Sequence, residues 1–470
     1  MKTKTNEDGL KKVLNTSDVL VVAFGAMIGW GWVVSSGGWI QSAGAMGTMV
    51  AFLIGGIMIY FVGLVYAELT TAMPESGGAK VFSQRAFGSI GSFICTWAVV
   101  LSYIGVVCFE ACSLPTIIQY IFPNFLKGYL YTVCGFDIYL SWLMVAIIFS
   151  ILITWINIRG VKAAAVLQKV LTIVIAGVGI VLIVMSALKG KPSNLHGQMF
   201  VGENMRNITG SILSIAMVAP FFLFGFDVIP QAAEEINVPL KKLGKLLVFS
   251  IALAVAFYGL VVLAVGYVMD TSEVADSVAG SGLVTADAMK KVFNSEVMAK
   301  VLILGGMCGI VTSWNSFILG GSRALMAMAD SCMIPHVFSK THPKYKTPYL
   351  SLILIGVLSI ISVFFGREML IWISNSASFA CCLTYSIVSM SFVKLRKTEP
   401  NLKRPYKVKN YRFIGFMAVI MSVVMCVMYL VPGTECTLST QEAVIAGGWG
   451  LLGCIFAFLC KRKYKDCFGK

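Results

Sequence analysis

Apolar runs of roughly 20 residues recur along the whole chain, each long enough to cross about 30 Å of hydrocarbon as an α-helix. These runs are apolar on all sides, whereas transmembrane strands would alternate apolar and polar residues. Backbone polar groups inside a bilayer must pair within the chain, and a helix pairs them locally. We therefore predict an all-α polytopic membrane protein.

Composition supports this fold class. Hydrophobic residues make up 58% of the 470 residues, and charged residues only 13%. A soluble domain of this length could not keep so much apolar surface from water. The net charge of +15 is carried mainly by short segments between the apolar runs. This placement is typical of a protein that follows the positive-inside rule, and it argues against a nucleic-acid partner.

The sequence predicts twelve transmembrane spans. They lie near 17–40, 47–70, 89–121, 139–157, 164–188, 209–230, 247–269, 298–329, 349–365, 369–393, 413–432 and 443–460. If the chain begins in the cytoplasm, basic residues in the inside segments far outnumber those in the outside segments. We therefore expect a multi-pass protein of the cell (plasma) membrane with both termini cytoplasmic and the lipid bilayer around it.

The first span contains three glycines, Gly25, Gly29 and Gly31, which weaken a helix by about 1 kcal/mol each relative to alanine. A helix break at membrane depth is tolerated where it lines a cavity. The free N–H groups at such a break suit a carboxylate, and the free carbonyls suit an ammonium group. Alternatively, the glycines only allow close packing of neighbouring helices.

The sixth span carries a second set of helix breakers. Pro220, Gly225 and Pro230 lie close to an acid within the membrane, Asp227. The first and sixth spans occupy corresponding positions if spans 1–5 and 6–10 are inverted repeats. Matched breaks favour one bipartite substrate site over two unrelated packing features.

These motifs carry a resemblance to a known family. Gly25 to Gly31 resembles the G-x-x-x-G-x-G break in the first helix of the amino acid–polyamine–organocation (APC) transporter superfamily. The sequence from Phe224 to Asp227, with the Ala-Ala-Glu-Glu of residues 232–235, is similar to the sixth-helix signature of its amino acid permeases. Residues 74–78 and 322–335 are similar to its first intracellular loop and the end of its eighth helix.

The resemblance implies the organisation of the chain. Ten helices over residues 17–393 would form the transport core, as a five-plus-five inverted repeat over 17–188 and 209–393 with helices 1 and 6 broken. Two peripheral helices would follow over 413–460. The cytoplasmic tails would be residues 1–16 and 461–470.

The resemblance also implies a substrate site. The N–H groups of Trp30 and Gly31 would bind a carboxylate, and Phe221 would gate the occupied site. The substrate-binding residues would be Met27, Gly29, Trp30, Gly31, Ile104, Val106, Phe221, Phe224 and Phe317. Of these, the carbonyls of Met27, Phe221 and Phe224 would receive an ammonium group. The apolar side chains of Ile104, Val106 and Phe317 favour a neutral substrate.

Two acids within the membrane, Asp227 and Glu110, are expected to act in coupling or gating. An ionised carboxylate there is costly unless it is paired, protonated or functional. Asp227 matches an acidic position of the family, although a helix-terminal acid bonded to backbone is the alternative. Glu110 is a proton acceptor, a group that recognises a cationic substrate, or a structural hydrogen-bond partner.

The coupling ion is left open between a proton and sodium. Proton-coupled members often carry a lysine in the fifth span, where this chain has Ile175. A sodium site near Thr312, Ser313 and Ser316 is therefore an alternative.

No part in transport is expected for the other acids or for the cysteines. Glu68 and Glu235 are predicted to be surface acids, and Glu235 to pair with a nearby lysine. Most cysteines lie in apolar runs and behave as small hydrophobic residues. Cys134 and Cys436 fall in predicted outside loops, where they could pair.

The sequence thus predicts a secondary active amino acid transporter (permease) for neutral amino acids, working by alternating access as a symporter driven by a proton or sodium gradient. An antiporter exchanging amino acids or amines, or an uptake system for polyamine-like amines, is the alternative. No cofactor is expected. Catalytic clusters, appended signalling domains and Walker-type loops are not recognised in the sequence, so an enzyme, a sensor or an energy-coupled pump is disfavoured.

Overall fold

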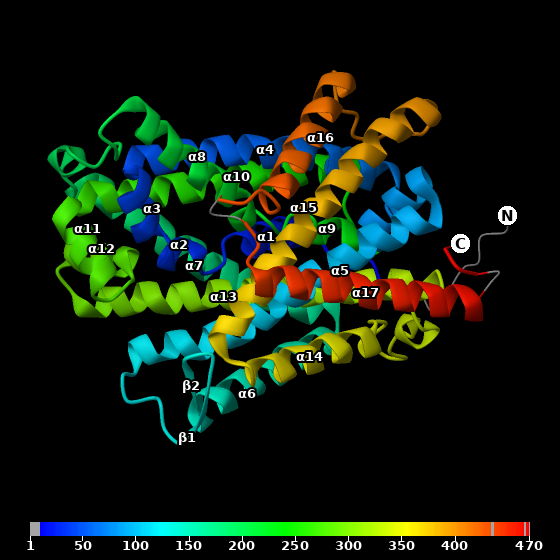
Figure 1. The fold of residues 1–470 in the computed structure, drawn as a ribbon, viewed down its shortest axis with the longest axis horizontal. Helices are drawn as coiled ribbons and strands as arrows, with labels where there is room; N and C mark the ends of the chain where they lie inside the picture. Colours follow the sequence, from blue (N-terminus) through cyan, green and yellow to red (C-terminus); the bar gives the residue numbers. More distant parts are fainter. Residues whose placement is uncertain (1–9, 434–436, 465–466, 470) are drawn as a thin grey trace.

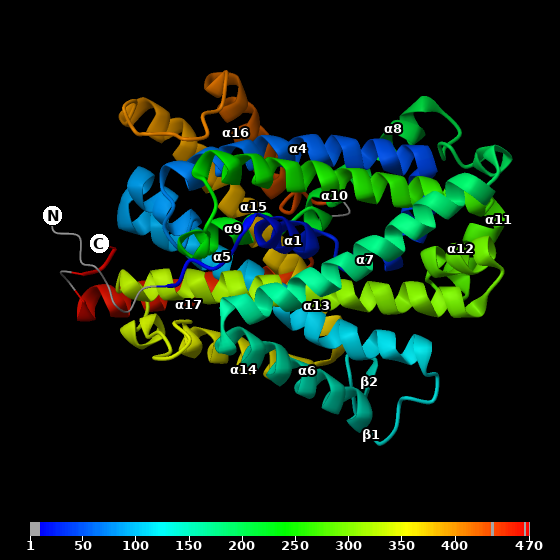
Figure 2. The same ribbon diagram turned by 180° about the vertical axis from the view of Figure 1, so that it is seen from behind.

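The computed structural model describes residues 10–433, 437–464 and 467–469. Parts of both predicted tails and Cys436 therefore lie outside the described residues. The long helices run broadly along the longest axis of the molecule (Figure 1). The first described residues and the end of the last helix lie at one end, here called the terminal end, and α11 and α12 lie at the opposite end (Figures 1 and 2).

The first half of the chain contains a broken first helix. The helix α1 ends at Met27, and the chain resumes helical geometry at Gly31, as the glycines predicted. The elements of this half are α1 (Thr16–Met27), α2 (Gly31–Val34), α3 (Ser36–Ala43), α4 (Ala45–Ala72), α5 (Ala79–Ile121), β1 (Tyr129–Val133), β2 (Phe136–Tyr139), α6 (Leu140–Arg159) and α7 (Val161–Lys189). The helix α5 is kinked at Gly88, whose φ is +72°.

The second half contains the second break, between α8 and α9. Its helices are α8 (Met205–Phe222), α9 (Val228–Gln231), α10 (Leu240–Val268), α11 (Thr271–Ala279), α12 (Val284–Phe293), α13 (Glu296–Asp330), α14 (Tyr349–Val363), α15 (Gly366–Thr398), α16 (Tyr411–Met428) and α17 (Thr440–Lys463). Three 3-10 turns, η1 (Pro192–Leu195), η2 (Ala233–Glu235) and η3 (His336–Ser339), lie in loops.

Eleven helical segments in the described residues are long and apolar enough to cross a membrane. The predicted ninth span corresponds to α14, a shorter apolar helix of 15 residues. The chain is therefore a multi-pass membrane protein that is almost entirely helical. The count of twelve spans and the inverted repeat stay predictions.

The two strands form an antiparallel hairpin that the sequence did not predict. Its turn residues Cys134 and Gly135 both have positive φ, at +51° and +80°. This geometry matches the right-handed twist of paired strands, and glycine adopts it readily. The hairpin therefore forms in the segment between the third and fourth predicted spans.

A buried amide network connects three helices of the core. The Nδ2 of Asn157 on α6 donates to the Oδ1 of Asn315 on α13, at 2.8 Å. The Nδ2 of Asn315 in turn donates to the Oε1 of Gln168 on α7, also at 2.8 Å. Each bond satisfies polar groups that would otherwise be costly in an apolar interior, so the network fixes the mutual position of α6, α7 and α13.

Two acids predicted to lie on the surface are instead buried in ion pairs. Glu235 pairs with Arg323 on α13 at 2.9 Å, and both side chains are almost fully buried. Glu68 on α4 pairs with Arg396 on α15 at 2.5 Å and with Arg404 at 3.0 Å. The prediction was wrong because the cationic partners come from distant parts of the chain, and pairing makes burial of the acids tolerable.

The structure contains a cysteine pairing that the sequence did not suggest. Cys134 is exposed with a free thiol, whereas the described residues contain a bridge between Cys332 and Cys467. The sequence offered no local spacing that pairs these two cysteines, because 135 residues separate them.

Candidate functional site

A cavity of about 220 Å³ lies between the two helix breaks. Its wall is formed by residues of α1, α2, α5, α8, α10, α13 and α15, and by the segments at the breaks. It extends along the last turns of α5, past Thr116 and Tyr120. Because α5 runs away from the terminal end, the cavity reaches toward the end that carries α11 and α12 (Figure 1).

The first break places backbone groups at the cavity. Met27, Gly29, Trp30 and Gly31 all line it. The carbonyl of Met27, the last residue of α1, accepts a 3.0 Å hydrogen bond from the Oη of Tyr258 on α10. Gly31 begins α2, and the first N–H groups of a helix have no partner within that helix. The break therefore presents both donors and acceptors to the cavity.

Gly31 is required by its surroundings. A Cβ at this position would lie 2.5 Å from two ring carbons of Phe222. The ring of Phe222 also meets Trp39 edge-on, with centroids 4.8 Å apart. The absence of a side chain on Gly31 thus lets the aromatic side chain of the second break approach the backbone of the first break.

The second break follows α8, which ends at Phe222, and precedes α9, which begins at Val228. Gly225 between them has a φ of +134°, a region that favours glycine. A Cβ there would lie 2.7 Å from the Cβ of Ala26 on α1. The two breaks are therefore in direct contact.

Asp227 fixes the second break to neighbouring helices. Its Oδ2 accepts a 2.6 Å hydrogen bond from the Oη of Tyr103 on α5. Its Oδ1 accepts longer bonds from the N–H of Gly225, at 3.2 Å, and from the Oη of Tyr385 on α15, at 3.3 Å. The carboxylate is buried outside the cavity lining. It is placed to hold the break and not to touch a molecule in the cavity.

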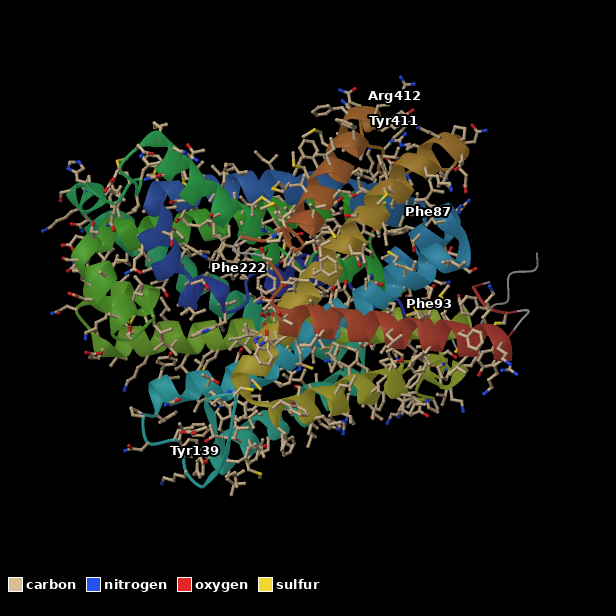
Figure 3. The ribbon with its side chains drawn as sticks, viewed as in Figure 1. Phe87, Phe93, Tyr139, Phe222, Tyr411 and Arg412 are labelled. Atoms are coloured by element: carbon tan, nitrogen blue, oxygen red, sulfur yellow. A yellow bond between two sulfur atoms is a disulfide. The ribbon has the colours of Figure 1, made fainter. Side chains whose placement is uncertain are left out.

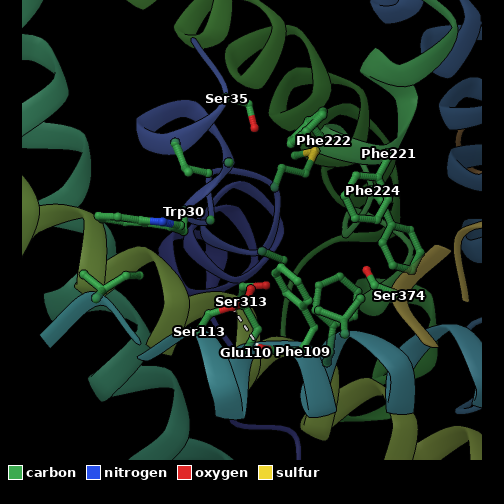
Figure 4. Close-up of a pocket in the computed structure, with 18 of the residues that line it drawn as sticks. Trp30, Ser35, Phe109, Glu110, Ser113, Phe221, Phe222, Phe224, Ser313 and Ser374 are labelled. Atoms are coloured by element: carbon green, nitrogen blue, oxygen red, sulfur yellow. Dashed lines mark hydrogen bonds between the residues drawn. The ribbon is translucent and has the colours of Figure 1, made fainter. Parts of the chain in front are cut away.

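Aromatic side chains form opposite walls of the cavity. Figure 4 shows Phe221, Phe222 and Phe224 together on one side and Trp30 projecting away from them on the other. Phe224 stacks on Phe317 of α13 at a centroid distance of 4.8 Å. These rings give most of the lining an apolar character suited to an uncharged side chain.

Trp30 fits because α13 carries a glycine opposite its ring. A Cβ on Gly306 would lie 2.2 Å from the Cζ3 of Trp30. The indole therefore occupies a notch in α13 while one side of the residue lines the cavity. This pairing explains how so bulky a residue is accommodated within the broken helix.

Glu110 brings an acid to the cavity wall. It lies on α5 and is largely buried, and a Cβ on Gly29 would lie 3.7 Å from its Oε1 and 3.6 Å from the Cβ of Ser313. The Oε2 atom is buried and has no hydrogen-bond partner in the described part of the chain. Such an oxygen can take up a proton.

The structure brings most of the predicted site residues together. Met27, Gly29, Trp30, Gly31, Val106, Glu110, Phe221, Phe224, Ser313 and Phe317 line the cavity. Ile104 is buried in α5 and does not belong to this lining. Residues that sequence reasoning missed are Phe109, Ser113, Thr116, Phe222, Tyr258 and Ser374. A phenol in the middle of an apolar run was a signal for Tyr258, whereas the serines offered none.

Oxygen atoms of α1 and α13 gather beside the first break. The Oγ1 of Thr312 lies 2.9 Å from the carbonyl oxygens of both Gly25 and Gly309. The hydroxyl of Ser316 donates to the carbonyl of Val22 at 3.3 Å. Neutral oxygens of this kind are ligands that hard cations accept. Within the described residues, no group of three or more His, Cys, Asp or Glu side chains is arranged to hold a metal.

Comparisons with known proteins point to one family. A family model described as amino acid permease matches residues 14–455. The chain is 25% identical to the branched-chain amino acid permease BcaP of Bacillus subtilis, over 98% of this chain and 95% of that protein. It is 24% identical to the methylthioribose transporter of the same organism, over 99% and 96%, and to its serine/threonine exchanger SteT, over 98% and 99%.

Proposed function

We propose, from the premise that this chain belongs to the amino acid permease family, that it is a secondary active transporter of neutral amino acids. It would act in the cell membrane with both termini in the cytoplasm. Relatives named for branched-chain amino acids and for serine and threonine support a neutral substrate. The family alone does not define the substrate, since another relative is named for methylthioribose.

The observation that carries this proposal is the contact of both helix breaks with one cavity. Donors at Trp30 and Gly31 would bind the substrate carboxylate. The carbonyls of Met27, Phe221 and Phe224 would accept hydrogen bonds from its ammonium group. Val106 and Phe317 would surround a neutral side chain, whereas Ile104 is buried in α5 outside the lining.

Alternating access would open the cavity to one side of the membrane at a time. In this structure the cavity extends toward the end with α11 and α12. At the terminal end, the buried pair of Glu235 and Arg323 joins the segment after α9 to α13. This arrangement supports an outward-facing conformation, with Phe221 as the gate that would close over a bound substrate.

For coupling, we propose Glu110 as the proton acceptor, with Asp227 as the residue that positions the second break. Glu110 lines the cavity, and its buried Oε2 has no hydrogen-bond partner in the described part of the chain. Sodium coupling is the alternative, and its ligands would be the oxygen atoms around Thr312, with Ser313 and Ser316 close by.

A second candidate function is exchange, or uptake of amines without a carboxylate. The position of Glu110 in the cavity wall favours this candidate, because a carboxylate there could bind a cationic group. Comparing uptake of an amino acid with uptake of its methyl ester separates the two candidates. Undiminished uptake of the ester would count against carboxylate binding at Trp30 and Gly31.

Transport by purified protein in liposomes tests the proposal. Labelled neutral amino acids are offered under an imposed proton gradient, an imposed sodium gradient, or neither, with protein-free liposomes as the control. We expect one gradient to drive accumulation. Uptake that is unaffected by either gradient but requires preloaded amino acid would establish exchange. The absence of transport of any amino acid would refute the proposal.

A further inference from the structure

The disulfide between Cys332 and Cys467 joins two distant parts of the chain at the terminal end. Cys332 follows the C-cap of α13, and Cys467 lies beyond the end of α17. Their Cα atoms are 5.8 Å apart, within the usual range for a disulfide. The two thiols are therefore placed to react with each other without rearrangement of the backbone.

Residues 467–469, here called the tail clasp, dock on the same surface through contacts other than the disulfide. The N–H of Gly469 donates a 2.8 Å hydrogen bond to the carbonyl of Ser331. The Nε2 of Gln84 donates to the carbonyl of Gly469. The ring of Phe468 stacks on Phe93 of α5, which Figure 3 labels near this end of the molecule.

Gly469 is the residue that fits closest to α5. Its φ is +75°, and a Cβ there would lie 2.0 Å from the Cβ of Ser89. Ser89 directly follows Gly88, where α5 is kinked. The tail clasp thus covers the kink, and any side chain at position 469 would push it away.

The backbone conformation of Cys332 also indicates that this position holds a cysteine for its sulfur atom. Its φ is +55°, in the left-handed region that glycine or asparagine usually occupies after a helix. A cysteine has no conformational advantage there. Its thiol is buried and directed at Cys467.

We propose that Cys332 and Cys467 form a reversible thiol–disulfide site that reacts with a low-molecular-weight disulfide such as oxidised glutathione. The terminal end is the predicted cytoplasmic end, where lasting structural disulfides are rare and reversible ones act in redox sensing. Oxidation fixes the tail clasp over the kink of α5, and reduction leaves it held only by non-covalent contacts.

The exchange proceeds in two balanced steps. The thiolate of Cys467, the less buried cysteine, attacks one sulfur of oxidised glutathione and releases one glutathione thiolate. The thiolate of Cys332 then attacks the Cys467 sulfur of the mixed disulfide and releases the second glutathione. Two cysteine thiols lose two protons and two electrons, and one glutathione disulfide becomes two glutathione thiols.

The tail clasp adjoins the segment that packs against the second broken helix. The N–H of Gly77 donates a 3.0 Å hydrogen bond to the carbonyl of Gln231 on α9. A Cβ on Gly78 would lie 2.6 Å from the Cβ of Pro230. Residues 74–88 are thus held between α9 and the tail clasp, so the oxidised protein opens more slowly at this end. This consequence rests on the proposed transport function.

The first experiment measures the bond itself. Full-length protein in liposomes is equilibrated with buffers of varied reduced and oxidised glutathione, free thiols are alkylated, and peptides are analysed by mass spectrometry. We expect the Cys332–Cys467 linked peptide to appear and disappear reversibly, to be absent in Cys467→Ser, and to persist in Cys454→Ser. Full alkylation of both thiols under the most oxidising buffer, or a bond that the reduced buffer cannot open, would overturn the proposal.

A second variant disturbs the docking of the tail clasp while leaving both cysteines in place. Gly469→Ala should shift the equilibrium several-fold toward the reduced form, because the added Cβ clashes with Ser89. The control Gly447→Ala on α17 meets nothing within 4 Å and should leave the equilibrium unchanged. An unchanged equilibrium in Gly469→Ala would show that the docked clasp does not bring the thiols together.

The third measurement concerns transport. We expect uptake per folded protein to be several-fold slower in the oxidised form than in the reduced form, with no difference in Cys467→Ser. Equal rates in both forms would refute the effect on opening. If the protein carries no amino acid, the peptide analysis still decides whether the redox site exists.

Discussion

The phenol of Tyr103 on α5 donates a 2.6 Å hydrogen bond to the carboxylate of Asp227, at the second helix break. Tyr385 on α15 reaches the other oxygen of the same carboxylate at 3.3 Å. A hydrogen bond to a charged acceptor contributes more than one between neutral groups. Asp227 therefore ties the broken helix to two neighbouring helices while remaining outside the cavity.

Replacing Asp227 by asparagine should slow transport while the protein still folds. The side chain keeps its shape but loses a charge-assisted bond worth about 1.5–3 kcal/mol, so the maximal rate should fall roughly tenfold or more. Uptake kinetics in liposomes, normalised to folded protein, measure the effect. Tyr103→Phe should act in the same direction and Tyr385→Phe less, because its bond is longer. Wild-type kinetics in Asp227→Asn would refute the positioning role.

Filling the notch behind Trp30 should change substrate selection. Gly306→Ala places a methyl group where the indole lies, so the ring must move toward the cavity. Overpacking of this kind costs about 1–3 kcal/mol, which corresponds to a loss of roughly five- to 100-fold in affinity for bulky neutral amino acids. Small amino acids should lose less.

Competition of labelled substrate uptake by large and small amino acids measures this change. Gly177→Ala on α7 is the control, because a Cβ there meets nothing within 4 Å. Equal loss of affinity for all amino acids in Gly306→Ala would mean that Trp30 does not set the size of the site.

The helix breaks were predictable because their causes are local. Glycines at 25, 29 and 31, and Pro220 with Gly225, weaken helical geometry within a few residues of where it fails. The structure ends α1 at Met27 and α8 at Phe222, inside the predicted segments.

What the sequence did not reveal depends on partners far apart in the chain. Glu68 lies 328 residues from Arg396, and Glu235 lies 88 residues from Arg323. Each acid was predicted to lie on the surface from its place near the end of a span, because a lone carboxylate is rarely buried. Likewise, the size of Trp30 is evident from the sequence, but the space that Gly306 leaves for its indole depends on how α1 and α13 pack.

Breaking the buried pair at the terminal end should destabilise the protein. Arg323→Met leaves the carboxylate of Glu235 buried without a partner, at a cost of about 3–5 kcal/mol. The double variant with Glu235→Gln should recover much of that loss. Thermal unfolding in detergent measures both. Arg85→Met is the control, because the pair of Arg85 and Glu399 is partly exposed and worth only about 0–1 kcal/mol.

Removing the charge of Glu110 should separate coupling from substrate binding. Glu110→Gln keeps the size and hydrogen-bonding capacity of the side chain but cannot take up a proton, so a proton gradient should no longer drive accumulation. Exchange of internal for external substrate should persist, because neither break is altered. The measurement is uptake with and without an imposed pH gradient, beside counterflow in preloaded liposomes. Ser374→Ala, which removes another polar group of the cavity, should keep its response to the gradient. Gradient-driven accumulation by Glu110→Gln would exclude this residue as the proton acceptor, and loss of counterflow as well would assign it to substrate binding.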